Sequence, residues 1–275
     1  MQKSIIISPV DGKPGEPGQV YYPIVQHSIP RPTPNANELL VKLTAASLNH
    51  RDVFIRRHLY FGVAFDCPLC SDGVGVVTAV GSDVRDPQKW LGKRVILNPG
   101  IGWKDSPDGP EDPTGYKLLG GTVLYRKGTL QELIAVDESE VEEAPPHLTD
   151  AEAAALPVTG LTAWRALESK VGEKGTGNLL ITGIGGGVAL IALRMAVARN
   201  ADVYVTSSSE EKLQKAVELG ARGGVNYKEE RWEKKLLEML PPEKRFFNAI
   251  IDGAGGDIIE KGTKLLRVSF PNHIG

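Results

Sequence analysis

The second half of the chain alternates short apolar runs with amphipathic ones, and this alternation constrains the fold more than any other feature. From Asn178 onward, the runs NLLITG, DVYVTS, GGVNY and FFNAIID have the length and composition of buried strands, and segments with helical spacing stand between them. Strands that alternate with helices form a parallel sheet covered on both faces. The sequence therefore predicts an α/β unit with a doubly wound sheet.

The first part of the chain predicts a different architecture. Up to about residue 145 it holds short β-rich runs separated by Gly and Pro clusters, and the stretch from Pro99 to Gly121 is typical of a long surface loop. Thr149 followed by Glu152 then indicates a capped helix start. We expect a mostly β domain over residues 1–145 and the α/β domain over residues 146–275.

Composition limits the classes of partner. A chain of 275 residues can hold two domains, and its formal net charge of -2 leaves no excess of Lys and Arg for nucleic acid or an anionic membrane. The apolar run before Ser8 is too short for a signal peptide or a membrane-spanning helix. Two cysteines cannot form a disulfide framework, so we expect a soluble, cytoplasmic protein.

A glycine-rich turn follows the first strand of the α/β unit. Residues without a Cβ let a pyrophosphate approach the main chain, and the following helix start supplies free N–H groups and positive charge. This setting predicts dinucleotide binding, with a tight turn of another α/β fold as the alternative. The residues expected to form the site are Gly183, Gly185, Gly186, Gly187 and, packed beneath the turn, Val188.

The end of the second strand favours NADP over NAD. Enzymes that use NAD usually present Asp or Glu there to the ribose, whereas this chain has Ser207 and Ser208. These hydroxyls, with Lys212 one turn later and Tyr227 after the next strand, suit a 2'-phosphate. The alternative is that Ser207 and Glu210 form a capping box and Lys212 is an ordinary solvated helix residue.

Five segments resemble consecutive signatures of the medium-chain dehydrogenase/reductase family. They are TAASLNHRD, SDGVGVVTAVGSDV, GTLQELIAV, TDAEAAALPVTGLTAWRAL and ITGIGGGVAL. The resemblance implies an α/β protein with a GroES-like β-barrel domain followed by a Rossmann domain. It also implies an oxidoreductase with a nicotinamide cofactor and a small-molecule substrate.

The resemblance departs from the zinc-dependent members at their metal positions. Their catalytic Cys and His correspond to Asn49 and Ser71 here, which are poor zinc ligands, and the loop that carries their structural zinc has no Cys. We therefore expect no metal, although Cys67 and Cys70 form a CxxC pair with a minor metal or redox alternative. This places the chain with the quinone oxidoreductases and enoyl reductases.

Within that branch, the resemblance implies an NADPH-dependent transfer of hydride to a small quinone, enone or carbonyl compound. Asn49 is expected beside the nicotinamide or the substrate oxygen as a hydrogen-bond donor, with a loop-capping Asn as the alternative. Tyr60 matches the Tyr of an RxGxY segment at the substrate pocket, although His58 replaces the Gly. The residues expected to reach the cofactor from elsewhere are Thr159, Thr162, Gly253 and Ala254.

Members of the family continue beyond the fourth strand, whereas this chain ends in KLLRVSFPNHIG. We therefore expect a C-terminally truncated Rossmann domain. The strands beyond this point commonly form the family's dimer contact, so a homodimer is one option that the sequence does not decide. A catalytically idle NADP(H)-binding or interaction protein is the alternative function.

Overall fold

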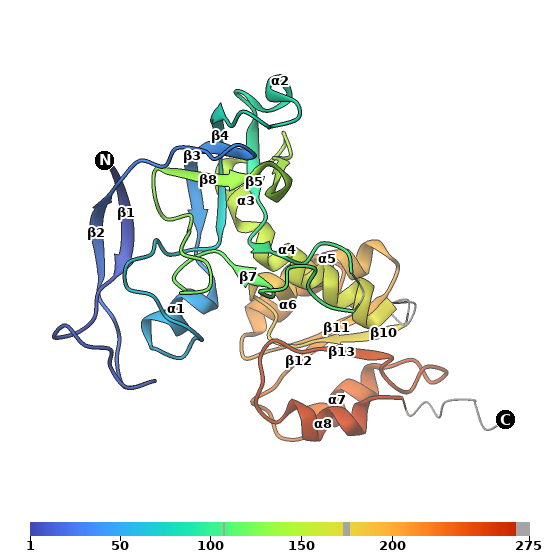
Figure 1. The fold of residues 1–275 in the computed structure, drawn as a ribbon. Helices are drawn as coiled ribbons and strands as arrows, with labels where there is room; N and C mark the ends of the chain where they lie inside the picture. Colours follow the sequence, from blue (N-terminus) through green and yellow to red (C-terminus); the bar gives the residue numbers. More distant parts are fainter. Residues whose placement is uncertain (107, 173–176, 268–275) are drawn as a thin grey trace. The chain divides into compact units, whose positions relative to one another are not determined.

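The computed structural model describes residues 1–106, 108–172 and 177–267 (Figure 1). Contacts divide the chain into two compact units, Met1–Val158 and Thr159–Gly275. Each unit is described by itself below. None of the helices in the described ranges is long and apolar enough to cross a membrane.

The first unit is built around a five-stranded antiparallel sheet with the order β8-β3-β4-β5-β9. Its strands are β3 (Glu38–Ser47), β4 (Asp72–Val80), β5 (Arg94–Leu97), β8 (Leu133–Asp137) and β9 (Val141–Glu143). Alternate side chains of these strands, such as Leu39, Val41 and Val95, are fully buried in one core. Within the described residues, β8 and β9 do not pair, so the sheet is not closed into the barrel that the resemblance implies.

Two smaller sheets complete the β structure of this unit. β1 (Gln2–Ile7) and β2 (Ile24–Ile29) pair antiparallel, and neither strand was expected from the sequence. β6 (Gly100–Ile101) and β7 (Lys117–Leu118) pair inside the stretch expected to be a loop. That stretch is therefore a small lobe with its own hairpin.

Short helices connect the strands of the first unit. They are α1 (His50–Arg56), α2 (Pro87–Trp90), the 3-10 turn η1 (Glu138–Glu140) and α3 (Asp150–Ala155). The predicted capping box is confirmed at α3, where Thr149 and Glu152 satisfy each other's backbone N–H groups. α4 (Pro157–Arg165) follows at once and continues into the second unit as a π-helical turn, Ala166–Val171.

The second unit is the predicted alternation of strands and helices. Its strands are β10 (Asn178–Ile181), β11 (Asp202–Ser207), β12 (Gly223–Asn226) and β13 (Ala249–Ile251), and its helices are α5 (Gly187–Ala198), α6 (Glu210–Glu218), α7 (Trp232–Met239) and α8 (Ile258–Leu265). The strands are all parallel, in the order β12-β11-β10-β13. Helices cover both faces (Figure 1).

Side chains of the central strand β10 enter two separate cores, because successive residues of a strand point to opposite faces. Leu179 and Ile181 pack with α5 and α6, whereas Leu180 packs with α7 and α8. The chain runs from β10 outward to β11 and β12, then crosses back to β13 on the other side of β10. In a doubly wound sheet, such a reversal marks the edge where ligands bind, at the carboxyl ends of the strands.

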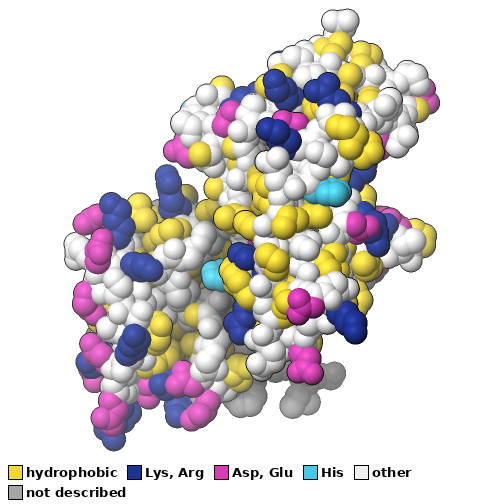
Figure 2. All heavy atoms as spheres, turned by 90° about the vertical axis from the view of Figure 1, so that its left-hand side faces the viewer, with side chains coloured by type: hydrophobic (Ala, Val, Ile, Leu, Met, Phe, Trp, Pro, Cys, Tyr) yellow, Lys and Arg dark blue, Asp and Glu magenta, His cyan; other side chains and the backbone are white. Residues whose placement is uncertain are grey.

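Charges are mixed on the surface. On the face drawn in Figure 2, Lys and Arg side chains are interspersed with Asp and Glu. This agrees with the formal net charge of -2 and provides no continuous basic area for a polyanion on that face.

Candidate functional site

The glycine-rich turn joins β10 to α5 at the reversal of strand order. Gly183 and Gly185 have φ angles of 63° and 113°, a left-handed region that residues with a Cβ rarely adopt. The turn is fixed to the neighbouring strand, because Gly183 N donates to Thr206 Oγ1 at 3.2 Å and Ile184 N donates to Thr206 O at 2.8 Å. Backbone geometry and strand pairing together hold the turn in one shape.

The next two glycines differ in what surrounds them. A Cβ on Gly187 would lie 2.8 Å from Thr159 Cγ2, so the absence of a side chain lets α4 pack against the start of α5. A Cβ on Gly186 would meet nothing closer than Gly183 O at 3.6 Å. A methyl group on Gly186 would thus make only an ordinary van der Waals contact, at the point where the first N–H groups of α5 lack intrahelical partners. Thr162 lies on the exposed side of α4.

Lys212 reaches back from α6 to this turn. A Cβ on Gly185 would lie 2.8 Å from Lys212 Cδ and 3.3 Å from Lys212 Nζ, so the lysine chain lies across the glycine. No acidic side chain among the described residues pairs with this ammonium group. An unneutralised positive charge thus stands at the turn that is expected to receive a pyrophosphate.

The serines at the end of β11 and just beyond it have different roles. Ser207 is buried, and its Oγ accepts from Ser209 N at 3.2 Å. Ser209 is the N-cap of α6 and accepts from Lys212 N at 3.4 Å, so the alternative cap by Ser207 and Glu210 is wrong. Ser208 is exposed, and Tyr227 lies close by because its N–H donates to Ser207 O at 3.0 Å.

The carboxyl end of β13 lies against the same turn. The Thr182 hydroxyl donates to the Asp252 carboxylate, and Gly253 N donates to Thr182 Oγ1 at 3.3 Å. A Cβ on Gly183 would lie 3.1 Å from Ala254 Cβ. The predicted cofactor residues of β10 and β13 are therefore neighbours at one sheet edge.

In the first unit, Asn49 is held by two carboxylates. It precedes α1 as the N-cap, and its backbone N donates to Asp52 Oδ2 at 2.8 Å. Its side-chain Nδ2 donates to Asp72 Oδ2, also at 2.8 Å. Asp72 is fully buried and accepts a second bond on Oδ1 from Val158 N at 2.9 Å. The loop-capping alternative for Asn49 is thus part of its structure.

The Arg51 guanidinium group binds Ser71, which stands where zinc-dependent members of the family have their catalytic His. Arg51 Nη1 donates to Ser71 Oγ at 2.5 Å and to Leu119 O at 2.7 Å, while Nη2 donates to Gly120 O at 2.9 Å. Arg51 is only 7% exposed, so these bonds are shielded from water. The chain itself thus supplies a permanent positive charge beside Ser71.

The ring of Tyr60 packs on the same guanidinium, with Arg51 Cζ 4.8 Å from the ring centroid. The substitution of His58 for the usual Gly does not remove the left-handed backbone, since His58 has a φ of 53°. Its Nδ1 bonds to Tyr22 Oη at 2.5 Å, which helps to hold this less favourable conformation. Tyr60 therefore contacts Arg51 directly, and the bond between His58 and Tyr22 holds the backbone two residues before it.

Burial controls the ionisation of this region. It raises the pKa of Asp72 to about 6, against the hydrogen bonds from Asn49 and Val158 N that favour the carboxylate. Burial likewise raises the pKa of Asp52. It also raises the pKa of the Cys70 thiol to about 12, so this group stays protonated and is a weak metal ligand at neutral pH.

Comparisons with known proteins agree with this geometry. The family model described as alcohol dehydrogenase GroES-like domain matches residues 35–146, and the one described as zinc-binding dehydrogenase matches residues 187–269. A zinc-type alcohol dehydrogenase-like protein, YogA, from Leptosphaeria maculans is 48% identical over 260 residues, which are 93% of this chain and 73% of that protein. The chain belongs to the medium-chain dehydrogenase/reductase family.

Two further members of this family illustrate its range. A chloroplast envelope quinone oxidoreductase homolog from Arabidopsis thaliana is 31% identical over 236 residues, which are 83% of this chain and 63% of that protein. A crystal structure of an NAD-dependent alcohol dehydrogenase has a TM-score of 0.80 at 30% identity and covers 97% of this chain and 74% of that chain. These matches support an oxidoreductase from an NAD(P)-binding family, with a GroES-like and a Rossmann-type domain.

The lobe that carries structural zinc in zinc-dependent members of the medium-chain family has a different network here. Glu111 accepts hydrogen bonds from the backbone N–H groups of Lys104, Asp105 and Ser106 at 2.7 to 3.0 Å. Asp112 accepts from the backbone and hydroxyl of Thr114 and from Lys117. Across the described ranges, no three His, Cys, Asp or Glu side chains are grouped to hold a metal ion.

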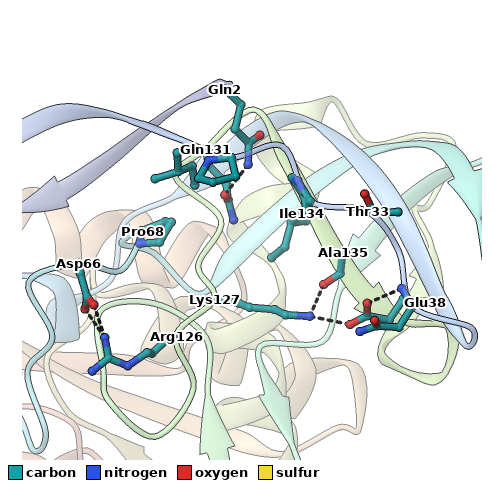
Figure 3. Close-up of a pocket in the computed structure, with 14 residues that line it drawn as sticks. Gln2, Thr33, Glu38, Asp66, Pro68, Arg126, Lys127, Gln131, Ile134 and Ala135 are labelled. Carbon is teal, nitrogen blue, oxygen red and sulfur yellow. Dashed lines mark hydrogen bonds and ion pairs between the residues drawn. The ribbon is translucent and has the colours of Figure 1, made fainter.

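A pocket of about 370 Å³ lies elsewhere in the first unit and contains none of the predicted site residues. Figure 3 shows that Lys127 points to Glu38 and Ala135, and that Arg126 pairs with Asp66. Because these charges already have partners within the chain, we assign no ligand to this pocket.

Sequence reasoning missed Asp72 and Arg51 as parts of the site. The available signal was a charged residue inside an otherwise apolar strand, SDGVGVV, because a buried carboxylate requires hydrogen-bond partners. The sequence pattern does not indicate which residues bond to the Asp72 carboxylate. Pairing over 23 residues to Asn49 and over 86 residues to Val158 follows from tertiary structure alone.

Proposed function

We propose that this chain is an NADP(H)-dependent oxidoreductase that transfers hydride to a small quinone, enone or carbonyl compound without zinc. Residues 1–145 form the substrate domain in this proposal, and residues 146–275 form the dinucleotide-binding domain. The observation that carries it is the Lys212 chain lying across Gly185 with no acidic partner among the described residues. A phosphorylated ligand would provide the missing negative charge.

The residues of the second unit fit a dinucleotide. Gly186 precedes α5, whose first N–H groups suit a phosphate, and Gly183, Gly253 and Ala254 lie at the adjoining sheet edge. At the end of β11, Ser208 is exposed and no acidic side chain stands in its place, which supports the 2'-phosphate of NADP. When bound, the nicotinamide ring supplies the hydride.

The first unit supplies the polar groups for the acceptor. Asn49 retains a second N–H on Nδ2, and Tyr60 carries a phenol, so either can donate to an oxygen that gains negative charge. The Arg51 guanidinium beside the Tyr60 ring adds positive potential. We assign positioning and charge stabilisation to these groups, with the final proton taken from Tyr60 or water.

Cofactor titration tests the proposal. We expect NADPH to raise the melting temperature of this chain more than NADH does, and to bind about tenfold more weakly to Lys212→Ala. Lys215→Ala is the matched control, because Lys215 lies on the same helix and pairs with Glu218 at 3.7 Å. Equal weakening by both variants, or no thermal shift with either cofactor, would contradict the assignment.

Turnover tests the catalytic part. NADPH absorbance should fall on addition of 1,4-benzoquinone, a simple enone or an aldehyde, with one hydride and one proton delivered per NADPH consumed. Elemental analysis of the purified protein should detect less than one zinc per ten chains, as roughly expected for a site without ligands. NADPH binding without turnover across the panel would favour the catalytically idle protein instead.

A further inference from the structure

Asp72 holds Asn49 through a bond that a carboxylate can make in only one sense. An ionised carboxylate is an acceptor and never a donor, so the amide atom that faces it must be Nδ2. The observed contact, 2.8 Å from Asn49 Nδ2 to Asp72 Oδ2, has this polarity. It follows that the two ends of the Asn49 amide cannot exchange places while Asp72 is charged.

Asp72 is itself rigidly placed. It is 0% exposed, its Oδ1 accepts from Val158 N at 2.9 Å, and its own carbonyl accepts from Thr129 Oγ1 at 2.7 Å. Val158 therefore holds the carboxylate, Thr129 holds the backbone of the same residue, and the carboxylate in turn fixes the Asn49 amide. A buried acceptor with this many partners has little freedom to reorient.

We propose that Asp72 is a positioning residue, which sets the orientation of the Asn49 amide for the hydride transfer. The inference rests on the proposed function for its catalytic consequence. Its structural part, the pinned amide, stands independently. Asp72 does not touch the reacting atoms, and its effect passes through the second N–H of Asn49 Nδ2.

Replacement of Asp72 by Asn preserves side-chain shape but leaves only one accepting oxygen. Val158 N–H would hold that oxygen, so the nitrogen at position 72 faces Asn49 and favours the opposite orientation of the Asn49 amide, with its Oδ1 as the acceptor. The charge-assisted bond is lost as well. The other charged or titratable groups that act on Asp72 are Arg51 and Asp52 of α1 and the Cys70 thiol, and all remain in the variant.

The same unit contains a matched control pair. Asn98 Nδ2 donates to Glu140 Oε2 at 2.8 Å, and Glu140 is 9% exposed. Glu140→Gln therefore neutralises another largely buried carboxylate that binds an asparagine amide. Neither Asn98 nor Glu140 contributes to the proposed site, so this variant should leave turnover unchanged.

Side-chain amide NMR of the free protein tests the pinned orientation without any ligand. The Asn49 amide signal is assigned by its loss in Asn49→Ala. We expect its protons to exchange with solvent at least tenfold more slowly in the wild type than in Asp72→Asn, with Glu140→Gln like the wild type. Equal exchange rates in wild type and Asp72→Asn would overturn the proposal.

Kinetics with NADPH and 1,4-benzoquinone test the catalytic consequence. We expect Asp72→Asn to lower kcat/KM about tenfold, mainly through kcat, and to cause no further loss in the Asn49→Ala background. Full additivity of the two substitutions would overturn the positioning role. If the wild type neither binds NADPH nor reduces the quinone, the proposed function fails, whereas the NMR measurement still decides whether Asp72 pins the amide.

Discussion

Polar groups are paired differently in two regions of the molecule. One region is the α1–β4 network, defined as Asn49, Arg51, Ser71 and Asp72, and the other is the glycine-rich turn after β10. In the network, most donors and acceptors are already paired within the chain, at 2.5 to 2.9 Å. At the turn, the first N–H groups of α5 have no intrahelical partner, and Lys212 has no acidic partner among the described residues.

This difference follows from burial. A buried charge must be satisfied by the fold itself, because the desolvation cost is present whether or not a ligand binds. An exposed cation has water as a partner and can exchange it for a phosphate at little cost. We therefore expect substitutions in the network to alter orientation and ionisation, and substitutions at the turn to alter affinity.

The largest effect should come from closing the turn. In Gly187→Val, the new Cβ would lie 2.8 Å from Thr159 Cγ2, so the Thr159 side chain or the start of α5 must shift, and the added branches crowd the turn. We expect NADPH affinity to fall at least 100-fold, on the order of 3 kcal/mol, by fluorescence titration. Gly186→Ala is the matched control, because its Cβ would lie 3.6 Å from Gly183 O and would not disturb the packing of the helices.

Gly186→Ala should therefore keep the melting temperature within about 2 °C of the wild type, and lose affinity only through the ligand's own contact with the turn. A Gly187→Val variant that binds NADPH normally would break the comparison, since the turn would then not be the phosphate site.

A smaller effect is expected at the end of β11. Ser208→Asp places a carboxylate where the 2'-phosphate is proposed to bind. Ser208 is exposed, unlike the buried Ser207, so the substitution introduces no buried charge. Repulsion of about 2 kcal/mol should shift the ratio of NADPH to NADH affinity about 30-fold toward NADH. Thermal shifts with both cofactors measure the ratio, and an unchanged ratio would remove Ser208 from the cofactor site.

Local rules explain how much of this could be predicted from the sequence. The β10–α5 turn was identified because Gly183 to Gly187 stand between an apolar run and a helix, all within a dozen residues. The capping box of α3 was identified for the same reason. In each case neighbouring residues determine both the geometry and the chemistry.

The α1–β4 network could not be predicted in this way. Arg51 contacts Leu119 O across 68 residues, and Asp72 contacts Val158 N across 86. The alternative interpretation, with Ser207 as the cap of α6, lay two residues too early because Ser207 and Ser209 have equal propensity for that position. The hairpin in the lobe between Pro99 and Gly121 has strands of only 2 residues each, too short for an alternation of apolar and polar residues to indicate them.

A third prediction concerns pH and the buried carboxylate. Since burial raises the pKa of Asp72 to about 6, the folded protein takes up a proton there at a higher pH than the unfolded chain does. The group therefore favours folding more at pH 5 than at pH 8. Relative to Asp72→Asn, the free energy of unfolding of the wild type should fall by about 1.5 kcal/mol over that interval.

Denaturant unfolding of both proteins at each pH measures this difference, and Glu140→Gln provides the same comparison at the control pair. A difference that stays constant from pH 5 to pH 8 would show that Asp72 titrates normally. The network would then be less desolvated than its geometry indicates.

The smallest effect is expected in the lobe, where Glu111 is an exposed counterpart to Asp72. The backbone N–H groups of Asp105, Ser106 and Lys104 lower its pKa to about 2, so the carboxylate stabilises the lobe above its unfolded pKa and loses this effect as pH falls toward 2. Glu111→Gln should increase hydrogen exchange at these three amides a few-fold at neutral pH, with global unfolding unchanged. The same exchange should not respond to a chelator in the wild type. Faster exchange after chelation would mean that a metal, and not the carboxylate, organises the lobe. The lobe would then resemble the glycine-rich turn, where a charged group is proposed to be neutralised by a ligand.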